Sequence, residues 1–237
     1  MLELHWFPGT CARVSLIALE EIGVPFETRV LLRWESEALA AYRRDVNPKG
    51  KLPTLVADGR RLTETPAILV WLARHYADAR LLPTGEGEAI EALSLMSWFA
   101  SGIHRAISRA RWPKFVNDEP DSFQRTKQMA LDELAADFAI LETRLRDHEW
   151  IFAEWTIIDG YLLWLWFKAV GSGFDPAGFS RLGQHAARCE QRPSVERALD
   201  REEAAYAELL PGMPPALAAM DGAVGRSTKL LRDRGGA

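Results

Sequence analysis

The sequence has few of the features that mark disulfide-stabilised, membrane-spanning or nucleic-acid-binding proteins. Only two cysteines, Cys11 and Cys189, occur among 237 residues, which is too few for a disulfide framework. The longest purely apolar run, Tyr161 to Phe167, is far shorter than the roughly 20 residues that cross a bilayer. Basic and acidic residues are interspersed and the formal net charge is -4, so no contiguous basic stripe is available for a phosphate backbone. We therefore expect no membrane insertion and no nucleic-acid partner.

The N-terminus lacks the basic region and apolar stretch of a secretory signal. Because the two cysteines also suit a reducing compartment, the expected location is cytoplasmic. Hydrophobic residues make up 48% of the chain, an ordinary value for a globular protein with a sizeable core. This composition excludes a disordered or fibrous chain.

The first part of the chain alternates strand and helix patterns. The expected strands are 2–6, 26–32, 52–56 and 60–62, and the expected helices are 11–22, 35–44 and 67–76. Asp58-Gly59 is a strong hairpin signal between the last two strands. Thr65 followed by Pro66 is predicted to cap the helix that comes next. The element order is therefore βαβαββα.

The second part shows only helical patterns, which are expected at 88–111, 121–147, 156–170, 177–192 and 194–209. Thr156 and Asp159 have the spacing of a capping box in the middle of this part. The predicted organisation is a first domain at 1–78, a Pro- and Gly-containing linker at 79–87, an all-α domain at 88–210 and a tail at 211–237. The fold class is α+β.

Several motifs in this order resemble the glutathione transferase family over about residues 2–205. They are the βαβαββα order, Leu52-Pro53 before a strand, Glu64-Thr65 at a helix start and the Thr156/Asp159 box. Pro8-Gly9-Thr10-Cys11 and Ser101-Gly102-Ile103-His104-Arg105 are most similar to the bacterial beta class. The resemblance implies a thioredoxin-like domain followed by a helical bundle, glutathione as co-substrate, no metal, a symmetric homodimer and a role in detoxification.

The resemblance also assigns residues to the parts of glutathione. It implies that Leu52 pairs its backbone with the cysteinyl part while Pro53 is held cis, although a simple edge-strand proline is the alternative. Glu64 is expected to take the ammonium and Thr65 the γ-glutamyl carboxylate at a helix N-terminus, unless both only cap the helix. Arg33 is expected to reach the glycyl carboxylate, or else to be a solvated loop residue.

Ser101, His104 and Arg105 are expected to contribute to the glutathione end or to the second-substrate pocket, again by resemblance. A lone helical histidine is as often a surface or core residue, and that alternative stays open for His104.

Two neighbouring residues are alternative candidates for the group that activates the glutathione thiol. Cys11 is expected in the first turn of a helix, where the helix dipole lowers the pKa of a thiol. Thr10 is the other candidate, because a hydroxyl that donates to the glutathione sulfur stabilises the thiolate. A third possibility is that Cys11 is only a small buried hydrophobic residue.

The predicted function is that of a glutathione S-transferase whose activated thiol attacks a small hydrophobic electrophile. One alternative is a glutathione-dependent thiol-disulfide or dehalogenase-type enzyme in which Cys11 is the nucleophile. The other is a non-catalytic transferase-like dimer with a binding or regulatory role.

Overall fold

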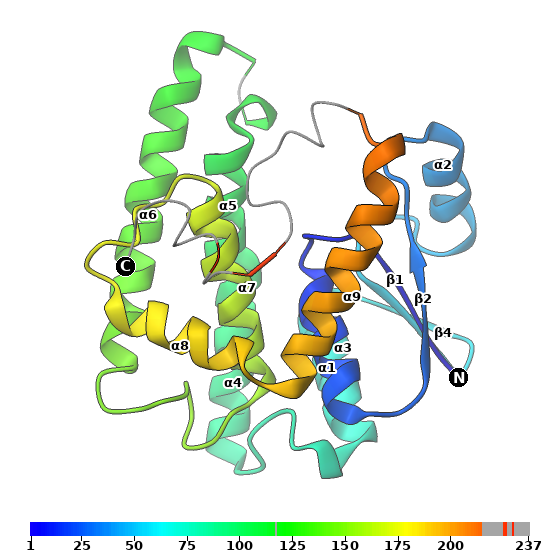
Figure 1. Cartoon of the computed structure of the whole chain (residues 1–237), viewed down its shortest axis with the longest axis horizontal. Helices are drawn as coiled ribbons and strands as arrows, with labels where there is room; N and C mark the ends of the chain where they lie inside the picture. Colours follow the sequence, from blue (N-terminus) through cyan, green and yellow to red (C-terminus); the bar gives the residue numbers. More distant parts are fainter. Residues whose placement is uncertain (117, 215–224, 227–228, 230–237) are drawn as a thin grey trace. The chain divides into compact units, whose positions relative to one another are not determined.

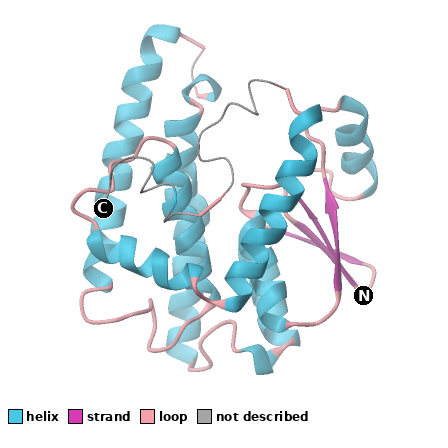
Figure 2. Cartoon of the chain, viewed as in Figure 1, coloured by secondary structure: helices cyan, strands magenta, loops and turns pink. Residues whose placement is uncertain are grey.

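The computed structural model describes residues 1–116, 118–214, 225–226 and 229, and the chain divides into two compact units (Figure 1). The first unit contains Met1–Leu82 and the segment that begins at Arg192, and the second runs from Pro83 to Gln191. Within the described residues every strand lies in the first unit, whereas the second is helical (Figure 2).

A four-stranded sheet in the order β2-β1-β3-β4 forms the centre of the first unit. The strands are β1 (Leu2–Trp6), β2 (Phe26–Val30), β3 (Thr54–Ala57) and β4 (Arg60–Thr63). β1 pairs in parallel with β2 and antiparallel with β3, and β3 pairs antiparallel with β4. Alternate residues of β1 are buried, as the two-residue repeat of a strand requires. The predicted parallel pair and hairpin are confirmed.

Four longer helices belong to this unit: α1 (Ala12–Ile22), α2 (Ser36–Asp45), α3 (Thr65–His75) and α9 (Pro193–Leu209). α1 packs against α3 and α9 and is buried along most of its length. It ends at Gly23, whose φ of +74° suits glycine and whose N–H donates to the Leu19 carbonyl at 3.1 Å. The strands with α1, α2 and α3 confirm the βαβαββα order and the thioredoxin-like fold.

The position of α9 differs from the predicted helical domain at 88–210, because this helix packs along α1 in the first unit. Glu20 of α1 accepts hydrogen bonds from Arg197 at 2.9 Å and from Arg201 at 2.8 and 3.1 Å. Glu20 and Arg197 are 177 residues apart in the sequence, so local patterns carry no sign of their pairing. Most of the predicted tail at 211–237 lies outside the described residues.

The second unit contains α4 (Glu86–Trp98), α5 (His104–Arg111), α6 (Phe123–Arg144), α7 (Ile157–Gly171) and α8 (Ser180–Glu190). A π-helical turn over Phe99–Ile103 separates α4 from α5, where the sequence predicted one continuous helix. Short 3-10 turns occupy Pro113–Phe115 and Pro120–Ser122 in this unit, and Ala77–Ala79 and Leu210–Gly212 in the first unit. π turns of this kind occur often at functional sites.

α7 is the core helix of the second unit, and nearly all of its residues are buried. The capping box at its start is confirmed, since Asp159 accepts the Thr156 N–H at 2.8 Å. The same carboxylate accepts the Ile151 N–H at 2.8 Å and lies 2.9 Å from Nε2 of His185 on α8. Within the described residues, no helix combines the length and apolarity needed to span a bilayer.

Candidate functional site

The turn between β1 and α1 positions Thr10 and Cys11. Gly9 opens it with a φ of +77°, a backbone conformation that glycine adopts without steric cost. The Thr10 hydroxyl donates to the Phe7 carbonyl at 2.7 Å and accepts the Ala12 N–H at 3.4 Å. Donation from Thr10 to a ligand thiol would therefore require the hydrogen bond to Phe7 to break.

Cys11 immediately precedes α1, and its Sγ donates to the Leu52 carbonyl at 3.6 Å. Burial raises the pKa of this thiol from 9.0 to about 11, which outweighs the lowering effect of a hydrogen bond from Thr65. The charge of Glu64 raises the pKa further, while that of Arg33 lowers it. The predicted lowering of the pKa is wrong, because desolvation at this position exceeds the effect of the helix start. A pKa of about 11 keeps the proton on the Cys11 thiol near pH 7.

Two buried side chains position the segment that leads into β3. Asn47 donates through Nδ2 to the Lys51 carbonyl at 2.8 Å, and the Tyr42 hydroxyl donates to the same carbonyl at 2.9 Å. The segment ends at the Leu52-Pro53 peptide bond, which is cis as predicted. Sequence reasoning missed both supporting residues. The Asn47-Pro48-Lys49-Gly50 turn was the available signal.

The start of α3 has an unusual backbone. Glu64 has a φ of +71°, which is rare for a residue other than glycine and is found preferentially at functional sites. Thr65 is buried and is the first helical residue, so the predicted cap position is shifted by one residue. Within the described part of the chain, the Glu64 side chain caps no N–H of α3.

Lys49 is a further residue of this region that the sequence did not indicate. Its Nζ forms an ion pair with Oε1 of Glu64 and donates to the Thr63 hydroxyl at 2.8 Å. Both members of the ion pair are exposed. The region therefore presents one anionic and one cationic group side by side.

The first unit thus brings together residues from four separate segments. Contacts or charge effects at the Cys11 thiol connect it with Leu52, Thr65, Glu64 and Arg33. These are the residues that the sequence assigned to thiol activation and to the glutathione backbone, ammonium and carboxylates. Their individual roles stay predictions.

Ser101, His104 and Arg105 lie in the second unit, on the π turn and at the start of α5. The Ser101 hydroxyl donates to the Ser97 carbonyl at 2.8 Å. The His104 ring packs edge-on against Trp164 at a centroid distance of 4.8 Å, and Arg105 is exposed. Their contribution to ligand binding also stays a prediction.

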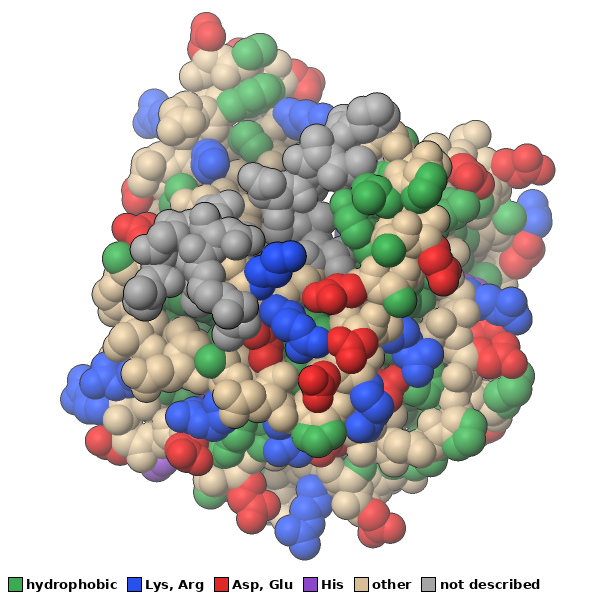
Figure 3. Space-filling model, viewed as in Figure 1, with side chains coloured by type: hydrophobic (Ala, Val, Ile, Leu, Met, Phe, Trp, Pro, Cys, Tyr) green, Lys and Arg blue, Asp and Glu red, His purple; other side chains and the backbone are tan. Residues whose placement is uncertain are grey.

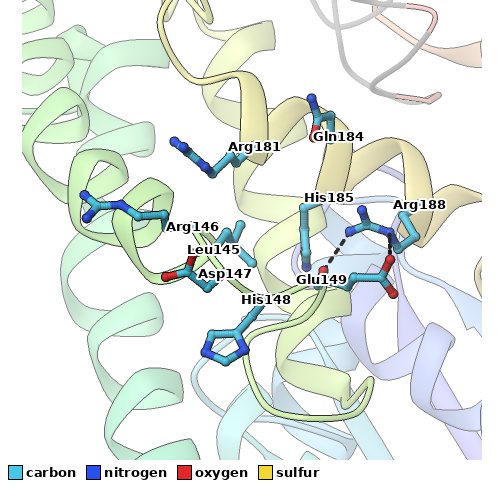
Figure 4. Close-up of a pocket in the computed structure, with 9 residues that line it drawn as sticks. All are labelled: Leu145, Arg146, Asp147, His148, Glu149, Arg181, Gln184, His185 and Arg188. Carbon is cyan, nitrogen blue, oxygen red and sulfur yellow. Dashed lines mark hydrogen bonds and ion pairs between the residues drawn. The ribbon is translucent and has the colours of Figure 1, made fainter.

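The second unit also contains a polar hollow between α8 and the end of α6 (Figure 4). Arg188 donates to the Glu149 carbonyl at 2.7 Å (Figure 4). His185 contacts the buried Asp159. These side chains connect α8 to its neighbouring segments. The remaining lining residues are Leu145, Arg146, Asp147, His148, Arg181 and Gln184. None of these lining residues is among the predicted site residues.

Concentrated charge or a cluster of metal ligands would suit an ionic or metal-bound partner. Acidic and basic side chains are interspersed on the face shown in Figure 3. Among the residues described, no cluster of three or more His, Cys, Asp or Glu side chains could hold a metal ion.

Comparison with known proteins gives consistent similarities. Residues 9–75 match the family model described as the N-terminal domain of glutathione S-transferase. The chain is 30% identical over 207 residues to glutathione S-transferase GstA of Escherichia coli O157:H7, covering 85% of this chain and 98% of that protein.

Two solved structures show the same relation. A beta class glutathione S-transferase of Sphingomonas chungbukensis has a TM-score of 0.72 and 30% identity, covering 84% of this chain and 98% of that one. A sphingomonad glutathione S-transferase complexed with glutathione has a TM-score of 0.73 and 29% identity, with coverages of 85% and 98%.

Proposed function

Because this chain belongs to the glutathione S-transferase family, we propose that its first unit binds glutathione at Cys11, Leu52, Glu64 and Thr65 and presents the thiol to an electrophile. The observation that carries this proposal is the clustering of these residues around one thiol. Cys11 contacts Leu52, receives a hydrogen bond from Thr65 and is affected by the charge of Glu64. The site residues, the second substrate, the homodimer, the cytoplasmic location and the role in detoxification are part of this proposal.

The γ-glutamyl end of glutathione is a zwitterion, with an ammonium and a carboxylate on one carbon. Glu64 and Lys49 offer the opposite pair of charges at adjacent positions. In the proposed complex Glu64 accepts hydrogen bonds from the ammonium, and Lys49 exchanges part of its contact with Glu64 for the carboxylate. Charge-assisted hydrogen bonds of this kind are about twice as strong as neutral ones.

The same carboxylate is proposed to bind at the start of α3. The first N–H groups of a helix lack intrahelical acceptors and carry the positive end of the helix dipole. Thr65 adds a hydroxyl at this point, which in the ligand-free protein hydrogen-bonds to Cys11. When the carboxylate binds, this hydroxyl turns from the Cys11 thiol to the carboxylate oxygen.

The cysteinyl part of glutathione is proposed to pair with the backbone of Leu52. An extended peptide can add to exposed backbone groups next to a strand, and Leu52 lies just before β3. Because Cys11 contacts the Leu52 carbonyl, a cysteinyl residue paired there brings its sulfur close to the Cys11 thiol. Arg33, which affects the same thiol electrostatically, is proposed to bind the glycyl carboxylate.

Cys11 is proposed to donate a hydrogen bond to the glutathione sulfur rather than to act as a nucleophile. Its raised pKa keeps the proton on the thiol near pH 7. A hydrogen bond to the thiolate form of glutathione lowers the pKa of the glutathione thiol. The glutathione thiol releases its proton to water, and the resulting thiolate attacks an electrophilic carbon, forming a carbon–sulfur bond as the leaving group departs with the bond electrons. Thr10 is the second candidate donor.

The second substrate is proposed to be a small hydrophobic electrophile, consistent with detoxification in the cytoplasm. Ser101, His104 and Arg105 are proposed to contribute from the second unit. A symmetric homodimer is proposed through α4, whose Ile90 and Leu93 are exposed and three residues apart on one helix face.

Calorimetric titration with glutathione tests the proposed site. We expect Thr65→Val to weaken glutathione binding by about 1 to 3 kcal/mol, since a buried hydrogen-bonding group is lost. Thr28→Val on β2 is the matched control and is expected to bind as the wild type does. Equal affinity of both variants and the wild type would refute the role of Thr65. Conjugation of a chromogenic halonitrobenzene by the wild-type protein tests the second-substrate class.

A further inference from the structure

A buried carboxylate on α9 contacts both sides of the Thr10-Cys11 turn. The side chains of Glu202 and Arg13 are 0% and 1% exposed. Oε1 of Glu202 accepts the Gly9 N–H at 2.8 Å, and Oε2 accepts Arg13 Nε at 2.8 Å and pairs with Arg13 Nη2. Both oxygens of Glu202 are therefore used on residues that flank the turn.

The contact to Gly9 joins Glu202 to the backbone at the start of the turn. Gly9 has a left-handed backbone, and its N–H points to a carboxylate that follows it by 193 residues in the sequence. Arg13 lies in the first turn of α1, two residues after Cys11. A carboxylate bonded to Gly9 and Arg13 limits how far Thr10 and Cys11 can move relative to Leu52 and Thr65.

A second set of ion pairs joins α9 to α1 at residues outside the Thr10-Cys11 turn. Glu20 pairs with Arg197 and Arg201, whose side chains are 53% and 45% exposed. α9 runs beside α1 in Figure 1, so the two sets lie along one helix pair. The Glu20 set anchors the helix, whereas the Glu202 set is buried and adds a backbone contact at the turn.

We propose that Glu202 is a positioning residue for the glutathione site, acting through the Gly9 N–H and the Arg13 guanidinium. This inference rests on the proposed function of the turn that contains Thr10 and Cys11. Glu202 fixes the turn so that the Cys11 thiol stays beside Leu52 and Thr65. Without this carboxylate the turn loosens and Cys11, which is half-buried, becomes more accessible to solvent.

The test uses two readouts on the full chain: glutathione affinity by calorimetry and the rate of Cys11 alkylation by iodoacetamide, located by mass spectrometry. In Glu202→Gln we expect glutathione affinity to fall by about tenfold or more and Cys11 to react at least several times faster. Glu20→Gln is the matched control on the same helix pair. It is expected to change the melting temperature while leaving both readouts within about twofold of wild type.

The double variant Arg13→Met with Glu202→Met covers the case in which Glu202→Gln does not fold. It removes both members of the Arg13–Glu202 ion pair, and with Glu202 the acceptor of the Gly9 N–H. We expect it to fold and to show the same loss of glutathione affinity and faster alkylation. Wild-type values of both readouts in a folded Glu202 variant, or equal changes in Glu20→Gln, would overturn the inference. Failure of the wild-type protein to bind glutathione would instead contradict the proposed function, and the alkylation rates would still test the turn.

Discussion

Glu202 and Asp159 are two fully buried carboxylates, one in each unit, and they stabilise different parts of the protein. Asp159 accepts two backbone N–H groups and contacts His185, so it fixes the start of the core helix α7. Glu202 accepts one backbone N–H and a guanidinium, so it fixes a turn beside the candidate site. In the second unit the buried carboxylate therefore stabilises only the fold. In the first unit it stabilises both the fold and the proposed site.

This difference separates changes that reduce stability from changes that reduce ligand binding. Substitutions around Asp159 are expected to lower the free energy of unfolding without changing glutathione affinity. Substitutions at the surface of the candidate site are expected to lower glutathione affinity without lowering the free energy of unfolding. Glu202 is the position where both effects meet.

The largest effect is expected for Asp159→Asn. The amide that replaces the carboxylate keeps one acceptor oxygen, and its NH₂ group faces N–H donors that have lost their acceptor. We therefore expect the free energy of unfolding to fall by about 3 kcal/mol or more. Urea unfolding measures this loss. Asp175→Asn is the matched control, because Asp175 is exposed and accepts the local N–H of Ala177 at 2.9 Å.

The control is expected to stay within about 0.5 kcal/mol of wild type. Folded Asp159→Asn is expected to bind glutathione as the wild type does. A large loss of affinity at unchanged stability would remove the distinction between the two carboxylates.

The second prediction concerns the pH dependence of Cys11 alkylation in the ligand-free protein. Because burial raises the pKa of this thiol to about 11, the thiolate fraction at pH 8 is about a hundredfold lower than for a thiol at the ordinary value of 9.0. We expect slow alkylation at neutral pH and a rate that rises as the pH approaches 11. A rate that levels off below pH 9 would show that the thiol is not desolvated and would restore the nucleophile hypothesis.

Glu64→Ala is expected to weaken glutathione binding by about 1 to 3 kcal/mol, the range for loss of a charge-assisted hydrogen bond. Calorimetry measures the affinity, and thermal unfolding should stay near wild type because the side chain is exposed. Glu27→Ala is the control, since Glu27 is an exposed carboxylate of β2 paired with Arg29. If both variants bind glutathione equally well, Glu64 has no part in ammonium recognition.

The smallest effect is expected for Lys49→Met. Its ammonium is exposed, so solvent screens the attraction to a carboxylate and we expect a loss of about 0.5 to 1 kcal/mol in glutathione affinity at low salt. The difference from wild type should shrink as the salt concentration rises. Lys51→Met, at an exposed position two residues away, should change neither value. A Lys49 effect that is independent of salt would argue against a charge contact.

The arrangement of the first unit was predictable because local signals and family motifs agree. Asp58-Gly59 indicates the hairpin, and Leu52-Pro53 with Glu64-Thr65 indicates the segments that meet at Cys11. The positive φ of Glu64 carries no local signal, because its residue type disfavours that conformation. The pKa of Cys11 was predicted in the wrong direction, since burial depends on packing that a helix start alone does not determine.

The contribution of α9 was not predictable from local sequence. Its helical pattern is clear, but Glu202 contacts Gly9 and Arg13 across most of the chain. The helical repeat places Glu202, unlike the exposed Glu203, on the face of Val195, Ala198 and Leu199, but it does not indicate which residues Glu202 contacts. Long-range partners of single carboxylates become visible only when the two helices are placed side by side.

A crystal structure of this protein with glutathione tests the central claim most directly. We predict the γ-glutamyl carboxylate at the Thr65 end of α3, the ammonium on Glu64, and the sulfur beside the Cys11 thiol. Glutathione bound away from α3, or with its sulfur out of reach of both Cys11 and Thr10, would contradict the proposed site.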